Sequence, residues 1–461
     1  MSAPLKSFFA ALLAVCGQMA CAADFEPATL AVANMRVGWN LGNTLDSNSG
    51  NTANMWIEAW TSRTPSDYET AWGQPVTTPE LIRLFKDAGF NAIRVPVTWY
   101  PHMEATFSAV RWDNDTQKLT AWDSQADPIG EKIQAAWMQR VRQVVDYVIS
   151  QGMYCILNVH HDTGAYNTAW LVADEDTFAR QKSRFEAAWQ QIAEEFKDYG
   201  EHLLFEGYNE MLDPYASWCF SSFATPEQYD EAVATSAYNA INSYAQTFVD
   251  VVRATGGNNA QRNLIVSTYG ACSGSGVWNQ HLQDPLKAMK LPDDKVSGHL
   301  IFEVHTYLDI KSLSAVKSEV DQMIRDLKTL LASKGAPVIF GEWGTSTDKG
   351  YDSYRSNMLA FARYFVEQAK ANGMATFYWM GLSNGEHRTV PEFNQSDLKD
   401  AIIKGFYGEA GYTGMTMPGV GLSSPVPFSH DLLGLVHPSP RHGVSLISQD
   451  DGRVRKVVCA R

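Results

Sequence analysis

The stretch APVIFGEWG (residues 336–344) is an apolar run that ends in an acidic side chain, and it directly follows a glycine that closes a helical pattern. A continuously apolar run is typical of a strand that is covered on both faces, as in a parallel sheet. The same unit of amphipathic helix, turn glycine and short apolar strand recurs between residues 30 and 407. The glycines of these units are Gly89, Gly152, Gly200, Gly256, Gly335 and Gly373.

Counting the units predicts the number of strands. Eight apolar runs have strand length, at residues 35–40, 91–96, 154–160, 203–209, 264–269, 300–306, 337–342 and 374–379. Eight alternating strands and helices favour a closed (β/α)8 TIM barrel, an α/β fold, as a single catalytic domain over residues 23–410. A doubly wound open sheet is the alternative. It would normally carry a glycine-rich phosphate loop after its first strand, whereas GWNLGNT (residues 38–44) has asparagines and a tryptophan there.

The composition restricts the partners. The 461 residues include 37 basic and 51 acidic side chains, for a formal net charge of −14. This balance disfavours nucleic acid as a partner, because phosphate binding needs a basic surface. No run of about 18 apolar residues that could span a membrane follows the N-terminal segment. We therefore expect no nucleic-acid or membrane partner, a neutral ligand, and a monomer.

The N-terminal 22 residues have the pattern of a secretory signal peptide. Lys6 precedes an apolar stretch at residues 8–15, and Ala20-Cys21-Ala22 forms a small-residue cleavage site. Cys21 raises the alternative of a lipid anchor, but Gln18 stands where that signal has an aliphatic residue. We expect a secreted protein, either extracellular or periplasmic.

Four cysteines remain after this segment, at positions 155, 219, 272 and 459. They are too few and too scattered for a disulfide framework or a cysteine-rich zinc site. Cys155 lies in an apolar strand and is interpreted as a buried thiol. Cys219 and Cys272 both follow strand ends, and the sequence leaves open whether they form a disulfide.

The repeating pattern stops after a last helix at residues 395–407. Residues 411–461 are rich in Gly, Pro and Ser and end in a basic stretch at residues 453–456. This composition predicts a poorly ordered C-terminal tail.

Two glutamates lie at the ends of buried strands. Glu342 ends the run at 337–342, and Glu210 follows LLFEGYN (residues 203–209). Barrel enzymes carry their catalytic groups at the carboxyl ends of the strands, so both side chains are expected at one rim. A pair of carboxylates is what hydrolysis of a glycosidic bond requires. Arg94, inside the apolar run at 91–96, needs a carboxylate partner, and a catalytic glutamate is the obvious candidate; a structural ion pair is the alternative.

Histidines and aromatic residues follow other strands. Alternation along residues 154–160 places His160 on one face and His161 on the other, so at most one of them should line the cavity. Glu303, His305 and Tyr307 share one face of the sixth run and favour a polar cavity wall. His-His-Asp at 160–162 by itself is compatible with a metal site, but the further ligands that barrel metal hydrolases need are absent from the pattern.

Taken together, these motifs resemble glycoside hydrolase family 5, the cellulase family. The resemblance covers residues 30–407 in order and spacing. It is carried by GWNLGNTLD (38–46), the run around Arg94, the His160-His161 pair, YNE (208–210), His305-x-Tyr307, GEWG (341–344) and Trp379.

The resemblance implies roles for eight residues. Glu210 is similar to the general acid/base of the family, and Glu342 to the nucleophile. The resemblance implies that Asn209 binds the sugar 2-hydroxyl and that Arg94 and Tyr307 hold Glu342. His160 and His305 would line the subsite on the glycone side, and Trp379 would be its stacking floor. Met211 departs from the proline that many members have after the acid/base.

The implied reaction is retaining hydrolysis of β-1,4-linked glucans through a covalent glycosyl-enzyme, without metal or organic cofactor. The motif at 38–46 and the histidine pair are most similar to the branch that cuts cellulose, with mixed-linkage glucan or xyloglucan as further substrates. Endo-β-1,4-mannanase is the alternative, and a metal-dependent hydrolase or a non-catalytic carbohydrate-binding barrel is less favoured. Trp170, Trp218 and Trp278 are candidate stacking platforms along an open cleft, with loop packing as the equal alternative.

Overall fold

The computed structural model describes residues 24–120, 122, 129–216, 229–276, 280–346, 353–379, 393, 395–415 and four short strands between 429 and 459. The chain divides into two compact units, Met1–Gly408 and Glu409–Arg461. The expected signal peptide at residues 1–22 lies outside the described residues. The boundary between the units lies two residues before the one expected from the sequence.

Eight parallel strands close into a barrel in the order β1-β10-β9-β8-β7-β6-β5-β2. Neighbouring strands run parallel at every pairing around the ring. Each strand falls within or overlaps one of the eight predicted runs, so the (β/α)8 prediction is confirmed. The strands are β1 (Val37–Asn40), β2 (Ala92–Val95), β5 (Tyr154–Asn158), β6 (Leu203–Glu206), β7 (Leu264–Cys272), β8 (Leu300–Leu308), β9 (Val338–Thr345) and β10 (Thr376–Tyr378).

The barrel interior has an apolar layer below a polar layer. The apolar layer is a buried cluster to which most strands contribute one residue, including Ala92, Ile156, Leu204, Ile265 and Ile301. Side chains two positions further along a strand point to the same side. At those positions the chain carries buried polar residues: Arg94, Asn158, Glu206, Ser267 and Glu303. A polar layer thus lies at the carboxyl ends of the strands.

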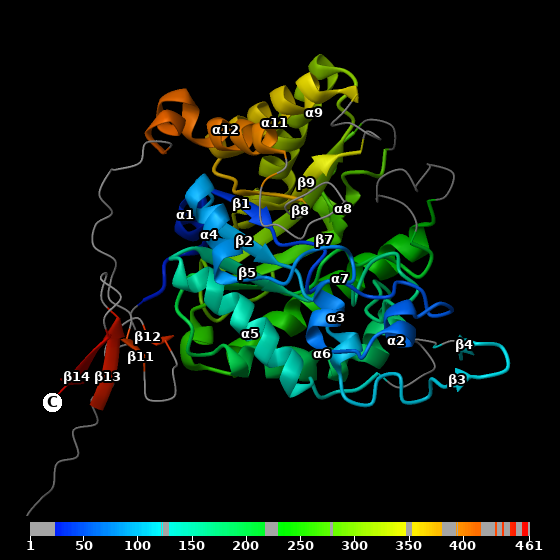
Figure 1. Cartoon of the computed structure of the whole chain (residues 1–461). Helices are drawn as coiled ribbons and strands as arrows, with labels where there is room; N and C mark the ends of the chain where they lie inside the picture. The colour runs from blue at the N-terminus through cyan, green and yellow to red at the C-terminus, as the bar shows by residue number, and fades with distance from the viewer. Residues whose placement is uncertain are drawn as a thin grey trace, which may run out of the picture. The chain divides into compact units, whose positions relative to one another are not determined.

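Helices connect the strands and cover the barrel (Figure 1). Their ends follow ordinary rules: Thr78 accepts a hydrogen bond from the Leu81 amide, Pro79 is the first residue of α4, and Gly89 ends it with a φ of 103°. The helices are α1 (Ala28–Met35), α2 (Trp56–Trp60), α3 (Pro65–Glu69), α4 (Pro79–Ala88), α5 (Ala135–Ser150), α6 (Glu175–Glu195), α7 (Glu231–Ala254), α8 (Asp284–Ala288), α9 (Leu313–Asp326), α11 (Arg355–Ala371) and α12 (Ser396–Met415).

The long connections carry smaller elements that the repeat did not predict. One is a hairpin of β3 (Trp112–Asp113) and β4 (Lys118–Leu119), between β2 and α5. The others are short 3-10 or π turns: η1 (Tyr100–His102), η4 (Gly257–Ala260), η5 (Leu327–Leu331) and η6 (Ala332–Lys334). Among the described residues, none of the helices combines the length and apolar character that a membrane span needs.

Both described cysteines of the barrel are free. Cys155 and Cys272 are buried thiols, and Cys272 Sγ lies 3.4 Å from the Leu282 carbonyl oxygen. Cys219, the proposed partner of Cys272, lies outside the described residues. The pairing of Cys219 with Cys272 therefore stays open, as the sequence left it.

The second unit begins near Gly408, whose backbone is not helical and interrupts α12. It contains a four-stranded antiparallel sheet in the order β12-β11-β13-β14. Its strands are β11 (Ser429–His430), β12 (Val436–His437), β13 (Gly443–Ser448) and β14 (Val454–Cys459). These strands were not predicted from the sequence. The expectation that residues 411–461 are poorly ordered stays a prediction.

Candidate active site

Glu210 and Glu342 lie together at the carboxyl ends of the strands. Glu210 follows β6 by four residues, and Glu342 is in β9. One oxygen of each carboxyl group and one nitrogen of His305 all lie within 4.8 Å of one another. The Glu342 side chain is 5% exposed and that of Glu210 is 18% exposed, so the second is the more accessible of the two.

Arg94 is the centre of the polar layer. Its Nη1 donates a 2.8 Å hydrogen bond to Glu342 Oε1. On the other edge of the guanidinium, Nε and Nη2 donate to the two oxygens of Glu206 at 2.6 and 2.7 Å. Nη2 also donates to Asn209 Oδ1 at 2.8 Å. Arg94 therefore contacts a catalytic candidate, as the sequence suggested, and a second carboxylate that the sequence analysis did not single out.

Glu342 receives a donor on each oxygen. Arg94 binds Oε1, and the Tyr307 hydroxyl donates to Oε2 at 2.6 Å. His160 Nε2 lies 3.8 Å from Oε1. Two donors on different oxygens hold the Glu342 carboxylate in one orientation. This arrangement suits a nucleophile, which must be aimed at the reacting carbon.

Glu210 has a different environment. Burial raises the pKa of its carboxyl group, and the charge of Glu342 adds to the increase, while the hydrogen bond from His305 opposes it. His305 Nδ1 lies 2.8 Å from Glu210 Oε1. A carboxyl group with a raised pKa beside an ionised one is the arrangement that divides acid and nucleophile roles between two carboxylates.

Trp379 and His160 form one wall of the site. Their rings stack with centroids 5.6 Å apart and an interplanar angle of 16°. Gly42 makes room for this indole, because a Cβ at position 42 would lie 2.8 Å from the Trp379 ring. Asn158 Nδ2 lies 3.0 Å from His160 Nδ1 and donates a hydrogen bond to Glu206. Because an amide nitrogen can only donate, it also donates to His160 Nδ1. The His160 proton is therefore on Nε2, the nitrogen that faces Glu342.

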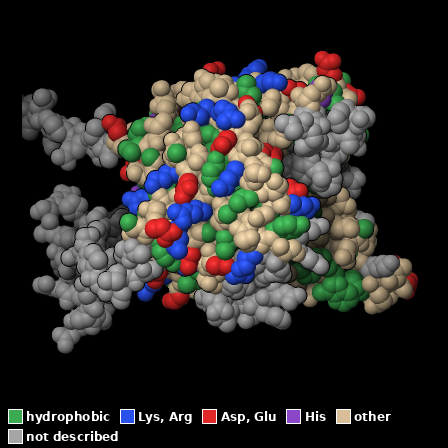
Figure 2. Space-filling model, turned by 90° about the horizontal axis from the view of Figure 1, so that it is seen from above, with side chains coloured by type: hydrophobic (Ala, Val, Ile, Leu, Met, Phe, Trp, Pro, Cys, Tyr) green, Lys and Arg blue, Asp and Glu red, His purple; other side chains and the backbone are tan. Residues whose placement is uncertain are grey.

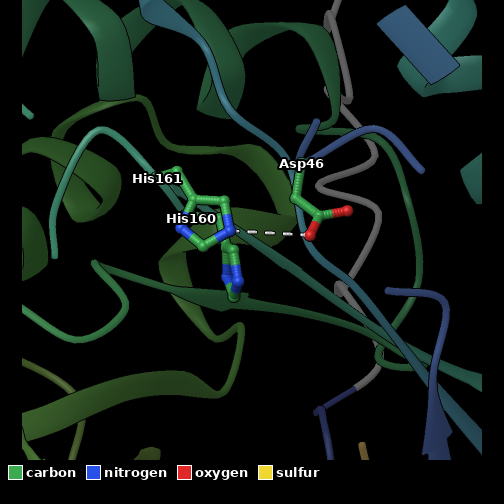
Figure 3. A group of neighbouring side chains, drawn as sticks. All are labelled: Asp46, His160 and His161. Atoms are coloured by element: carbon green, nitrogen blue, oxygen red, sulfur yellow. Dashed lines mark ion pairs between the residues drawn. The ribbon is translucent and has the colours of Figure 1, made fainter. Parts of the chain in front are cut away.

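His161 corrects the alternation argument. Alternation predicted His161 on the opposite face from His160, but β5 ends at Asn158 and the two-residue period ends with it. The two imidazole rings contact each other with centroids 4.4 Å apart. The His161 imidazole points towards Asp46, with Nε2 3.7 Å from Oδ2 (Figure 3). Burial raises the pKa of Asp46 to about 7 and lowers that of His161 to about 3.

Two groups of side chains offer donors close enough together for a metal ion. They are Asp46 with His160 and His161, and Glu210 with His305 and Glu342. In the first group, His160 has one nitrogen occupied by Asn158 and a proton on the other. In the second, the acidic oxygens already accept from His305, Arg94 and Tyr307. The absence of a metal cofactor stays a prediction.

Part of the polar layer was not predicted from the sequence. Glu206, Asn158 and Asn40 all contact Arg94 or one another, and Asn40 Oδ1 accepts from Arg94 Nη1 at 3.1 Å. The sequence did contain one signal for these three residues, because each of them lies at the carboxyl end of an otherwise apolar strand. Trp170 is buried and donates to Asp162, so it is loop packing and not a platform. Trp218 and Trp278 lie outside the described residues.

Comparison with known proteins identifies relatives. The family model described as cellulase (glycosyl hydrolase family 5) matches residues 53–385. Endoglucanase A of Clostridium longisporum is 32% identical over 411 residues, which cover 84% of this chain and 67% of that protein. Endoglucanase 1 of Ruminococcus albus is 34% identical over 385 residues, which cover 80% and 77%.

Solved structures give the same picture. A GH5-4 broad specificity endoglucanase from an uncultured bacterium has 51% identity and a TM-score of 0.72, and the match covers 83% of this chain and 97% of that one. PbGH5A of Prevotella bryantii, a family 5 glycoside hydrolase, has 37% identity and a TM-score of 0.66, with 83% and 99% covered.

Proposed function

Because this chain belongs to glycosyl hydrolase family 5, the cellulase family, we propose that it hydrolyses β-1,4-linked glucans with Glu342 as nucleophile and Glu210 as acid/base. The chain is a glycoside hydrolase of the endoglucanase type. One observation supports the two roles: one oxygen of each carboxyl group lies within 4.8 Å of the other, but the two groups have different partners. Glu342 is held by a guanidinium and a phenol, and Glu210 by an imidazole.

The spacing supports a retaining mechanism. Carboxyl groups that are about 5 Å apart leave no room for a water between them and the sugar, whereas inverting enzymes need roughly 6.5–9.5 Å. In the first step Glu342 attacks the anomeric carbon while Glu210 gives its proton to the departing oxygen. In the second, Glu210 takes a proton from water as the water displaces Glu342 from the sugar. The charge on Glu342 is absent in the intermediate, which lowers the proton affinity of Glu210 when it must act as a base.

The other site residues have proposed roles in binding. Asn209 Oδ1 accepts from Arg94, which leaves its amide N–H groups for the sugar 2-hydroxyl next to the reacting carbon. Trp379 offers an indole face for a pyranose ring. His160 donates from Nε2, and His305 borders the same subsite. No step of this proposal needs a metal or an organic cofactor.

For the substrate we propose a β-1,4-glucan backbone, with cellulose, mixed-linkage glucan and xyloglucan as candidates. Relatives support this range: one solved neighbour at 36% identity is a mutant of PbGH5A in complex with a xyloglucan tetradecasaccharide, and another at 28% is a lichenase mutant with cellotetraose. The acidic chain suits a neutral polysaccharide. On the face seen in Figure 2, basic and acidic side chains are interspersed and form no concentrated basic patch. Secretion and a monomeric state complete the proposal.

Two measurements test the proposal. Reducing-end release is compared on carboxymethylcellulose, lichenan, xyloglucan and mannan. Activity on mannan alone would show that the protein is a mannanase and not a glucanase.

Glu342→Ala and Glu210→Ala should each lower the rate of hydrolysis of these polymers by at least about a thousandfold. With an aryl β-cellobioside whose leaving group needs no protonation, Glu210→Ala should still form the glycosyl-enzyme, and azide should release it as a β-glycosyl azide. Glu342→Ala should form no such intermediate.

Glu69→Gln is the matched control for these variants. Glu69 is another fully buried carboxylate, paired with Arg140 at 2.7 Å, outside the barrel interior. Its loss should lower stability and leave the activity of the folded enzyme unchanged. Near-normal hydrolysis by Glu342→Ala would refute the assignment of the nucleophile.

A further inference from the structure

Glu303 is a buried carboxylate that the proposed mechanism does not use. It lies in β8, two residues before His305, and its side chain is 0% exposed. Its Oε2 accepts a 2.7 Å hydrogen bond from the Ser267 hydroxyl. Its Oε1 lies 3.3 Å from Arg94 Nε and 3.4 Å from His305 Nε2. Because it has no exposed surface, it cannot contact the substrate and can act only through its neighbours.

The neighbouring strand leaves space for this carboxylate. A Cβ at Gly341 in β9 would lie 1.5 Å from Glu303 Oε1, so every other residue at this position would displace the carboxyl group. The φ angle of Gly341 is not positive, so the backbone freedom of glycine does not explain why a glycine occupies this position. Its lack of a side chain allows the close approach of Glu303 to His305.

His305 lies between two carboxyl groups. Nδ1 is 2.8 Å from Glu210 Oε1, and Nε2 is 3.4 Å from Glu303 Oε1. Both nitrogens can donate only in the imidazolium form. Burial by itself lowers the pKa of His305, but the carboxylates of Glu342, Glu210 and Glu303 outweigh it and raise this pKa to about 10.

We propose that Glu303 is a positioning residue that holds His305 as an imidazolium and thereby orients the acid/base Glu210. This inference rests on the proposed function. The imidazolium donates from Nδ1 to Glu210 Oε1 whether or not Glu210 is protonated. The other oxygen, Oε2, then carries the proton to the departing oxygen in the first step and receives one from water in the second. A buried carboxylate that fixes a catalytic imidazole is a known device of enzyme sites.

Other charged groups face Glu303, His305 and Glu210. Arg94 from β2 contacts Glu303, Glu206 from β6 contacts Arg94, and Glu342 from β9 lies with one oxygen 3.6 Å from His305 Nδ1. Tyr307 donates to Glu342. Only the Glu303 carboxylate is within hydrogen-bond distance of His305 Nε2 among the residues that the structure describes.

Glu303→Gln tests the proposal because it keeps the shape and removes the charge. Without that charge His305 loses its proton more easily, and a neutral His305 no longer lowers the proton affinity of Glu210. Glu210 then stays protonated to higher pH, so the basic limb of the kcat/KM profile should move up by about half to one pH unit. On the same substrate kcat should fall about tenfold, because a neutral His305 holds Glu210 less firmly in the orientation for proton transfer. Glu69→Gln should leave both unchanged.

A double-mutant cycle decides whether the effect passes through His305. In a His305→Asn background, Glu303→Gln should no longer shift the basic limb; an equal shift there, or no shift in the single variant, would overturn the proposal. If Glu303→Gln does not fold, the protonation state of His305 is measured in the wild-type protein instead. The ¹⁵N resonances of His305, assigned by their loss in His305→Asn, should report two protonated nitrogens at pH 7, and a neutral ring would overturn the proposal. Wild-type hydrolysis of β-glucan tests the proposed function separately.

Discussion

Arg94 joins Glu342 to a second, fully buried carboxylate: its Nη1 lies 2.8 Å from Glu342 Oε1, while Glu206 accepts from its Nε and Nη2. The guanidinium is thus held on one edge and presents the other to Glu342. Such two-sided, planar recognition needs arginine, because a lysine ammonium is a single point of positive charge.

Arg94→Lys should therefore lower kcat/KM on lichenan or carboxymethylcellulose by at least about a hundredfold, a loss of roughly 3 kcal/mol in transition-state stabilisation. One ammonium cannot reach Glu206 and Glu342 with the geometry of the fork. Thermal unfolding should show a lower Tm as well. Arg253→Lys, at a buried pair with Asp294 remote from these glutamates, should lower Tm without changing kcat/KM. An active Arg94→Lys enzyme would contradict the role of Arg94.

Tyr307→Phe removes the donor to Glu342 Oε2 and keeps the ring. A hydrogen bond to a charged group contributes about 1.5–3 kcal/mol, so kcat/KM should fall by roughly ten- to a hundredfold with the fold retained. The matched control is Tyr68→Phe, which removes a comparable buried hydrogen bond from Tyr68 to Glu58 outside the barrel. Steady-state kinetics and Tm of both variants check the prediction, and a loss of activity in Tyr68→Phe alone would reverse it.

Trp379→Ala should raise KM and lower kcat/KM by about ten- to a hundredfold, because the flat face that stacks on a sugar ring is lost. Trp379→Phe should recover most of the activity. Trp60, an indole that is 73% exposed, provides the control, and Trp60→Ala should behave as wild type on soluble oligosaccharides. Unchanged kinetics of Trp379→Ala on cellotetraose would remove Trp379 from the binding site.

Asp46 should make stability depend on pH. Burial raises its pKa to about 7, against about 3.9 in an unfolded chain. Between these values the folded state holds a proton that the unfolded state has released, so stability falls as pH rises from about 4 to 7. Asp46→Asn lacks this dependence, and its Tm relative to wild type should rise between pH 5 and pH 8. A pH-independent difference for Asp46→Asn would contradict the raised pKa.

Strand positions were readable from the sequence because each strand is a largely apolar run and six of the eight follow a turn glycine, and parallel strands covered on both faces are apolar in this way. Glu342 and Glu210 were readable for the same reason, since a charge at the end of such a run is conspicuous. His161 was misplaced because alternation applies only within a strand. Glu206 was overlooked because its position in the chain gives no indication of the arginine that it binds, which lies 112 residues earlier.

The sequence by itself determined the barrel and the two glutamates at its rim, because these depend on local periodicity and strand order. Only the tertiary structure decided which charges pair. It placed Arg94 between Glu342 and Glu206, and His305 between Glu210 and Glu303. Those pairings depend on barrel closure, which brings residues from β2, β6, β8 and β9 within hydrogen-bond distance. The physical reason is that partner choice among buried charges is set by distances of a few ångströms across the barrel, which no one-dimensional pattern records.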